Sequence, residues 1–278
     1  MTINPEADYA APSEWPSLIP TQAERWLEAV PARHSRRSYT GESVPPEHLD
    51  TLESLSESFR PWPDARAVLV REAPASMFVG IIGSYGGISG APSAIVLVGS
   101  HDVPAERIGY TGEALVLEAT ALGLDTCWVG GFFSPGATNK LVEHGEDERV
   151  YAVIPVGIAE GNISRKERLL FGAGHEKRRR TPDQIALGWQ SWPVWARRGV
   201  VAARVAPSAM NREPWRFALG RDEAVTVSFD GLDMPRLSKR LDCGIAMLHF
   251  ELGAAAEGVR GAWEQLASPG VGRFVAGE

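Results

Sequence analysis

Several features that would assign a chain to a class are missing from this sequence. It has two cysteines in 278 residues, Cys127 and Cys243, and no Cys-x-x-Cys pair. A disulfide framework is therefore not expected, and a reducing cytoplasm fits this composition. No run of about 18 apolar residues occurs, so no membrane span is expected. The N-terminus lacks a basic segment followed by an apolar one, so no signal peptide is expected.

Excess positive charge and the common nucleotide motifs are missing too. A formal net charge of −7 argues against nonspecific binding to nucleic acid or to anionic membranes. No G-x-G-x-x-G follows a strand and no G-x-x-x-x-G-K-[ST] occurs, which disfavours a Rossmann dinucleotide site and a P-loop. The histidines show no metal-ligand spacing, so we expect no metal site. The 44% of apolar residues can build a sizeable core, in one large domain or two fused halves.

Hydrophobic periodicity and breaker residues predict alternating helices and strands. We expect helices over residues 21–29, from Pro46 onward, over 76–85, 106–122, from Pro182 onward, over 194–205 and 244–256. We expect strands over residues 67–71, 94–98, 127–131, 150–156, 217–219 and 224–229. The strand at 127–131 is expected to run into a turn at Gly130 and Gly131.

Two parts of the chain are similar to each other at a spacing of 135 residues. Gly109 pairs with Gly244, Gly123 with Gly258 and Trp128 with Trp263. This spacing predicts two copies of one α+β unit, with chance similarity of two Ala/Gly-rich helices as the alternative. The predicted organisation is an extended arm over 1–20, a first half over 21–160, a basic connector over 161–180 and a second half over 181–278.

Two polar segments, one in each half, stand out from the repeat. The first half contains Arg33-His34-Ser35-Arg36-Arg37, and the second half contains Pro207-Ser208-Ala209-Met210-Asn211-Arg212-Glu213-Pro214-Trp215. Taken alone, the first reads as a solvated basic turn and the second as a structural loop with a buried tryptophan. Each half lacks a good counterpart of the other's segment. Such complementary losses indicate one composite site between the halves, because two separate sites would need both segments twice.

These residues resemble motifs of the nitroreductase superfamily of FMN-dependent oxidoreductases. Residues 33–37 are similar to the family's Arg-x-Ser-x-Arg/Lys, and residues 207–215 to its Pro-Ser-x-x-Asn-x-Gln-Pro-Trp, with Glu213 replacing the glutamine. Residues 123–131 resemble the Gly-Leu-Gly segment before the contact with flavin N5. Residues 177–182 resemble the basic stretch near the family's usual C-terminus.

In common members of this superfamily two chains form a dimer with FMN at the interface, and each segment comes from a different chain. The present chain resembles the fused, single-chain branch, the TM nitroreductase family. The resemblance implies a nitroreductase-like α+β fold, with two similar halves packed as an intramolecular pseudo-dimer and antiparallel or mixed sheets flanked by helices. It also implies one FMN per chain and makes a monomer plausible.

The resemblance implies cofactor-binding residues from three places in the chain. Guanidinium groups would hold the FMN phosphate by charge-assisted hydrogen bonds, and a backbone N–H at a glycine would approach N5. The implied set is Arg33, His34, Ser35, Arg37, Gly130, Gly131, Arg178, Arg180, Pro207, Ser208, Ala209 and Asn211. No catalytic side chain is implied, because the cofactor carries the redox chemistry.

The implied reaction is ping-pong transfer from NADH or NADPH through FMN N5 to a small-molecule acceptor such as a nitroaromatic or a quinone. Two alternatives remain open. One is a flavin-binding protein without turnover, which Glu213 in place of glutamine allows. The other is a structural protein with a degenerate site. The sequence decides neither between NADH and NADPH nor which acceptor is physiological.

Overall fold

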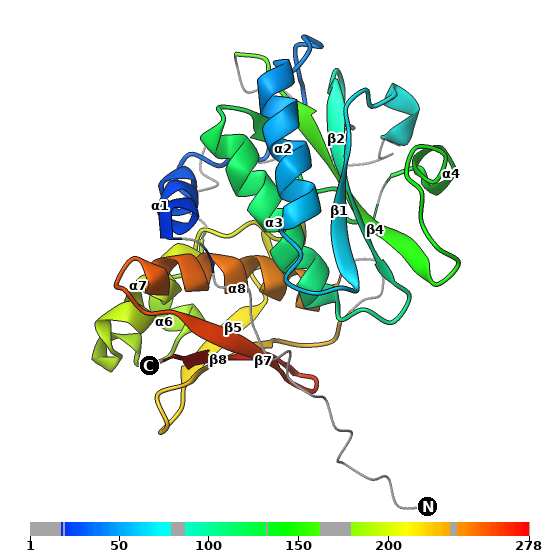
Figure 1. Ribbon diagram of the computed structural model, residues 1–278. Coiled ribbons are helices and arrows are strands. Elements are labelled where there is room, and N and C mark those ends of the chain that lie inside the picture. The colour runs from blue at the N-terminus through cyan, green and yellow to red at the C-terminus, as the bar shows by residue number, and fades with distance from the viewer. Residues whose placement is uncertain are drawn as a thin grey trace, which may run out of the picture.

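Two four-stranded antiparallel sheets form the framework of the computed structural model, which describes residues 18, 20–78, 87–131, 133–161, 179–233 and 238–277 (Figure 1). The first sheet contains β1 (Ala65–Val70), β2 (Ser93–Ser100), β3 (Asp125–Thr126) and β4 (Glu148–Gly157). The second contains β5 (Trp215–Leu219), β6 (Val225–Phe229), β7 (Gly261–Gln265) and β8 (Gly270–Ala276). The helices are α1 (Pro20–Ala29), α2 (Pro46–Ser58), α3 (Ala105–Ala121), α4 (Pro135–Thr138), α6 (Pro182–Ile185), α7 (Val194–Ala203) and α8 (Lys239–Ala255). Short 3-10 turns occur at Ala75–Met77, Trp189–Ser191 and Ala209–Asn211.

The two sheets have the same topology. Their strand orders are β1-β2-β4-β3 and β5-β6-β8-β7. Each has a register shift where its second strand pairs with its fourth, opposite Leu97 and Val98 in the β2–β4 pair and opposite Val227 and Ser228 in the β6–β8 pair. The helix before the third strand, α3 or α8, ends alike in both halves, at a glycine with φ of +78° or +77°. These repeated features support the prediction of two copies of one unit.

The run of apolar residues in β2 is explained by burial on both faces of the first sheet. Ile95 and Leu97 face the large core that extends into the second half, whereas Ala94, Val96 and Val98 face a smaller core on the opposite face. In the second sheet, β6 alternates between buried and half-buried residues, because only one of its faces is covered. This matches the alternation expected over 224–229.

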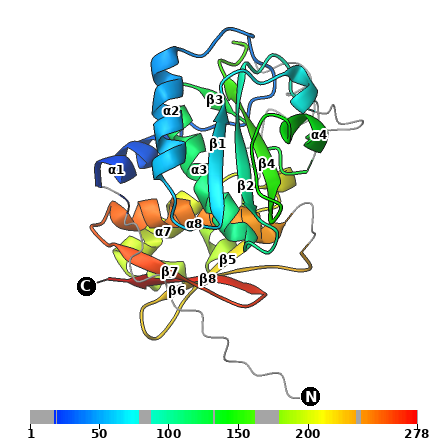
Figure 2. The ribbon, with the colours of Figure 1, turned by 45° about the vertical axis from the view of Figure 1, so that its right-hand side comes forward.

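Helices α3 and α8 lie between the two sheets and cross at close range (Figures 1 and 2). A Cβ added at Gly109 would lie 2.0 Å from the carbonyl oxygen of Leu241, and one at Gly244 would lie 1.9 Å from that of Glu106. Glu106 and Leu241 are themselves 135 positions apart, so the two contacts are equivalent and reciprocal. Reciprocal contacts are what a two-fold interface produces. They support the pseudo-dimer interpretation.

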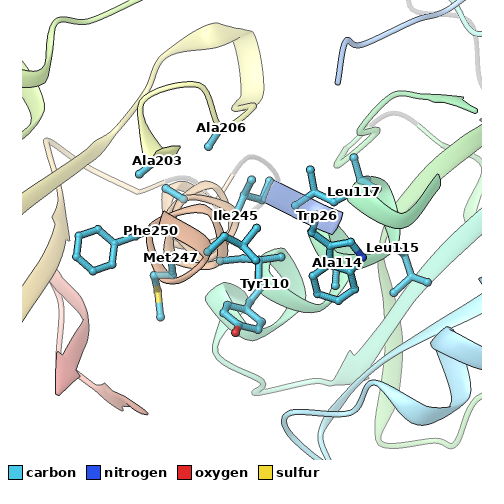
Figure 3. Close-up of a cluster of buried hydrophobic side chains, with 14 of the residues drawn as sticks. Trp26, Tyr110, Ala114, Leu115, Leu117, Ala203, Ala206, Ile245, Met247 and Phe250 are labelled. Atoms are coloured by element: carbon cyan, nitrogen blue, oxygen red, sulfur yellow. The ribbon is translucent and has the colours of Figure 1, made fainter. Parts of the chain in front are cut away.

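A single hydrophobic core continues across this crossing. Trp26 from α1, Tyr110 and Leu115 from α3, and Ile245 and Phe250 from α8 belong to one cluster (Figure 3). The guanidinium of Arg240 in α8 also donates to both carboxylate oxygens of Glu106 in α3. Burial and pairing therefore join the halves across α3 and α8.

Three sequence expectations need correction. The strand expected over 127–131 lies two residues earlier, at β3, and only Val129 rejoins the sheet, by a bridge to Val153. After Thr126 the Trp128 ring packs against Gly112 of α3. Helix α8 begins at Lys239 rather than Gly244, and strands β7 and β8 were not expected. Most of the helix expected over 76–85 lies outside the described residues.

Within the described ranges, no helix is long and apolar enough to cross a membrane. Over the same residues, no group of three or more His, Cys, Asp and Glu side chains is placed to hold a metal ion.

Candidate functional site

The basic segment of the first half runs along the edge of the first sheet. The backbone N–H of Arg36 donates to the Thr126 carbonyl at 2.9 Å, and Ser35 and Thr126 form a parallel bridge. The segment therefore lies directly beside the chain leading to Gly130 and Gly131. His34 and Ser35 are exposed, while Arg37 is half-buried.

Arg33 differs from its neighbours because its side chain turns into the protein. The side chain is 7% exposed, and its Nε lies 4.0 Å from Oε1 of Glu113, a fully buried carboxylate on α3. Burial lowers the pKa of the Arg33 guanidinium, whereas the charge of Glu113 raises it. Among the described residues, the buried Nε of Arg33 has no hydrogen-bond partner. Since buried donors are usually paired, this position can still receive an acceptor.

The Pro207–Trp215 segment of the second half has an unusual backbone. Met210, Asn211 and Glu213 have φ of +53°, +55° and +47°, in the left-handed region. This conformation costs non-glycine residues about 1 kcal/mol or more each, with asparagine the most tolerant. Hydrogen bonds hold it in place: the N–H of Glu213 donates to Oγ of Ser208 at 3.0 Å. Strain of this kind clusters at functional sites.

A buried carboxylate on α8 holds the Pro207–Trp215 segment in place. Asp242 of α8 accepts from the N–H of Ala209 at 3.1 Å and from Nε of Arg212 at 2.8 Å. Burial raises the pKa of Asp242 to about 6, although Arg212 and the Ala209 N–H oppose the shift.

The raised pKa of Asp242 predicts a specific pH dependence of stability. The pKa of Asp242 in the folded protein, about 6, exceeds the reference pKa of 3.8. The contribution of this group to the free energy of unfolding is therefore fully present below the unfolded pKa. It is lost as the pH rises through the folded pKa, by about 3 kcal/mol in all. We expect Asp242→Asn to remove this component. Denaturant unfolding of both proteins from acidic to neutral pH checks it, and parallel stability curves would show that Asp242 does not titrate in this range.

Arg179 connects the second-half segment to the first half. Its Nη1 donates to the carbonyl oxygen of Ala206 at 2.5 Å, and its Nε lies 3.7 Å from Oε1 of Glu213. Burial lowers the pKa of the Arg179 guanidinium, Glu213 raises it, and the neighbouring positive charge of Arg33 lowers it. The two guanidinium groups therefore interact electrostatically. Guanidinium groups bind anions by charge-assisted hydrogen bonds, so both are candidates for holding an anionic group.

Glu213, where the family has glutamine, is a buried partner of this arginine group. Its Oε2 accepts from the N–H of Arg180 at 2.8 Å, and its buried Oε1 makes no hydrogen bond within the described part of the chain. Burial raises the pKa of the Glu213 carboxyl, whereas the Arg180 N–H and the charges of Arg179, Arg180 and Arg204 lower it. The substitution therefore places a negative charge beside Arg179, which a glutamine would not supply.

The glycine turn of the first half leaves open space. A Cβ added at Gly130 would meet no atom of a described residue within 4 Å. The neighbouring Trp128 attaches the turn to helix α3, because its Nε1 donates to Oε2 of Glu113 at 2.8 Å. A ligand could therefore approach the backbone at Gly130 without displacing protein atoms.

The structure brings together only part of the predicted set. Arg179 at the end of the basic connector contacts Ala206 and Glu213, which border residues 207–211, and interacts electrostatically with Arg33. Arg180 instead directs its guanidinium toward Asp230, 3.8 Å away, and Arg178 lies outside the described residues.

Three residues that meet at the site were not predicted, namely Glu113, Arg179 and His249. Glu113 could have been found as a glutamate within an apolar helix, and Arg179 belongs to the basic connector over residues 161–180. For His249 the sequence offered no signal.

Two cavities lie elsewhere. One of about 560 Å³ is bordered by α1 and the C-terminal end of α8, and one of about 370 Å³ is lined by residues between His101 and Val150. No predicted site residue lines either cavity. The candidate site is therefore defined by convergent side chains and not by these cavities.

The fold is nitroreductase-like, with two antiparallel sheets and flanking helices. The structure of a "putative nitroreductase" from Thermotoga maritima MSB8 superposes with a TM-score of 0.60 at 19% identity, covering 97% of this chain and 98% of that one. A nitroreductase family protein from Clostridium difficile 630 has a TM-score of 0.42 at 20% identity, covering 58% and 95%. An FMN-dependent nitroreductase from Clostridium difficile R20291 has a TM-score of 0.39 at 20% identity, covering 48% and 87%.

The family follows from the sequence comparison. The sequence model of the family described as "Putative TM nitroreductase" matches residues 26–254. The chain belongs to this family, which confirms the resemblance stated from its motifs. No curated protein matches the chain.

Proposed function

We propose that this protein is an FMN-dependent oxidoreductase that binds one FMN per chain between its two halves. The observation that carries the proposal is that Arg179 contacts Ala206 and Glu213 of the second half and interacts electrostatically with Arg33 of the first half. Family membership and the nitroreductase-like fold support it. Bound FMN would supply the redox chemistry, taking electrons from NADH or NADPH and passing them to a nitroaromatic or quinone acceptor.

The residues present fit the cofactor. The buried Nε of Arg33 still lacks an acceptor among described residues, and Arg179 adds a second guanidinium nearby, so an anionic group would be held by charge-assisted hydrogen bonds. The side chain of Asn211 is half-buried and makes no hydrogen bond to any described residue, which leaves its amide for a ligand. The open space beside Gly130 allows a flat ring to approach its backbone N–H.

The absorbance spectrum of the purified protein, before and after addition of NADH or NADPH, tests the proposal. We expect a yellow protein with one flavin per chain that bleaches on reduction, and ping-pong kinetics with an excess of acceptor. A yellow protein that neither nucleotide bleaches would indicate a flavin-binding protein without turnover. A colourless protein that takes up no added FMN would indicate a structural role. Two flavins per chain would contradict a single composite site.

Gly130→Ala separates binding from folding. The added methyl meets no atom of the described residues within 4 Å, so the unfolding free energy should change by no more than about 0.5 kcal/mol. The same methyl would occupy the space from which the flavin ring approaches, so FMN affinity should fall at least several-fold. Fluorescence titration of the apoprotein with FMN measures this. Gly136→Ala, at an exposed glycine with equally open surroundings, should leave affinity unchanged. Equal affinities for both variants would place the flavin elsewhere.

A further inference from the structure

One fully buried carboxylate touches three parts of the chain that surround the proposed site. Oε2 of Glu113 accepts from Nε1 of Trp128 at 2.8 Å. Its Oε1 lies 2.9 Å from Nε2 of His249 and 4.0 Å from Nε of Arg33. Glu113 and His249 are both completely inaccessible to solvent. Since burying a charge is costly unless it is paired, a glutamate kept in this apolar helix needs all of these partners.

The three partners come from different parts of the fold. Trp128 immediately precedes the open turn at Gly130, and Arg33 begins the basic segment of the first half. His249 belongs to α8 in the second half, and its Nδ1 lies 3.2 Å from the carbonyl oxygen of Ala202. Ala202 is in the last turn of α7, which leads into the Pro207–Trp215 segment. Both polar segments and the glycine turn are therefore connected to one side chain.

The hydrogen bonds define how this group is held together. Both ring nitrogens of His249 lie within hydrogen-bond distance of an oxygen, Nδ1 of the Ala202 carbonyl and Nε2 of the Glu113 carboxyl group. The Glu113 carboxyl group in turn accepts from Trp128 and lies beside the positive charge of Arg33. The remaining charged or titratable groups coupled to this cluster are Arg179 and the buried thiol of Cys127.

We propose that Glu113 is the positioning residue of the composite site, and that His249 orients it from the other half through the contact between its Nε2 and Oε1 of Glu113. The Glu113 carboxyl group contacts both Arg33 and Trp128, which precedes the Gly130 turn. The same group therefore determines where an anionic cofactor would approach Arg33 and where the cofactor's ring would approach Gly130. His249 makes this arrangement depend on the docking of the two halves. The inference rests on the proposed function, because the site it positions is the flavin site.

Glu113→Gln tests the role by removing the charge at nearly constant shape. The matched control is Thr111→Val on the same helix, where a fully buried hydroxyl has no hydrogen-bond partner among the described residues. For each protein we would measure the denaturant unfolding of the apoprotein, the Kd for FMN, and the midpoint potential of bound FMN. We expect Glu113→Gln to raise the Kd by about tenfold or more, the loss typical of a charged hydrogen bond. The potential should become more positive, because a negative charge near the flavin has been removed, and Thr111→Val should shift neither quantity.

The outcomes separate this inference from the proposed function. If the wild-type protein binds no FMN, the proposed function and this inference both fail. If the wild type binds FMN and Glu113→Gln binds it with unchanged Kd and potential, the flavin site stands and the positioning role is wrong. If Glu113→Gln does not fold, Trp128→Phe removes one donor to the carboxylate while keeping the charge. An unchanged Kd for that folded variant would also overturn the role, and a raised Kd would support it.

Discussion

Replacing Arg33 or Asn211 by alanine is expected to weaken FMN binding about tenfold to a hundredfold, the loss of one charged or well-placed hydrogen bond. The residues belong to opposite halves, so equal dependence on both is the signature of a composite site. Arg33 would lose its guanidinium contact to the cofactor's anionic group. Asn211 would lose an amide that no described residue engages. Fluorescence titration of each apoprotein with FMN measures the effect.

Each substitution needs a control for effects on the protein itself. Asn211 has φ of +55°, where alanine is strained, so Asn211→Gly removes the amide and keeps a permissive backbone. Both Asn211 variants should lose similar affinity. For Arg33, a lysine keeps the positive charge beside Glu113 but lacks the planar fork, so Arg33→Lys should fold normally and bind FMN more weakly. If only one of the two positions affects FMN, the site is not shared between the halves.

Alanine at Gly244 or at Gly109 is expected to destabilise the protein by about 3 kcal/mol or more, the upper range for overpacking a buried contact. The new Cβ would lie 1.9 Å from the Glu106 carbonyl oxygen or 2.0 Å from that of Leu241. Both obstacles are backbone atoms of the facing helix, so no side chain can rotate away and α3 and α8 must separate. Native proteins have only about 5–15 kcal/mol of stability, so either change is severe. Denaturant unfolding monitored by circular dichroism measures it.

The pseudo-dimer interpretation makes this prediction sharper. Because the two contacts are equivalent, Gly109→Ala and Gly244→Ala should cost similar free energies, and the double variant less than their sum, since one separation of the helices relieves both clashes. Gly136→Ala is the neutral control, with nothing within 4 Å of the added Cβ. A small effect at one of the two glycines and a large effect at the other would argue against equivalent packing.

Much of the fold could be predicted because its signals are local. Pro46 at the start of α2 and the unbroken apolar run of β2 act within a few residues, and the glycine after α3 does so as well. The repeat at a spacing of 135 residues also predicted that the two halves are copies of one unit, and the identical strand orders of the two sheets agree with this prediction. Strands β7 and β8 were missed because their sequences, GAWEQ and GVGRFVA, show little regular alternation of apolar and polar residues. They are strands because they pair with each other and with β6.

The site was predicted less completely because its contacts are distant in sequence. The motif segments were recognised, but nothing in the composition of α3 indicates that Glu113 would meet a histidine 136 positions later. The inward turn of Trp128 could not be predicted either, since it depends on the space that Gly112 leaves on α3.

By itself, the sequence determined the family and predicted the two-fold repeat and the segments proposed to carry the chemistry, because each of these resides in residue types at set spacings. Only the tertiary structure decided that the side chain of Arg179 meets Ala206 and Glu213 while that of Arg180 faces Asp230, and that Glu113 meets Arg33, Trp128 and His249 in the interior. The physical reason is burial. A buried charge must find its partners wherever the packing of α3 against α8 brings them, and that packing is a property of the whole folded chain.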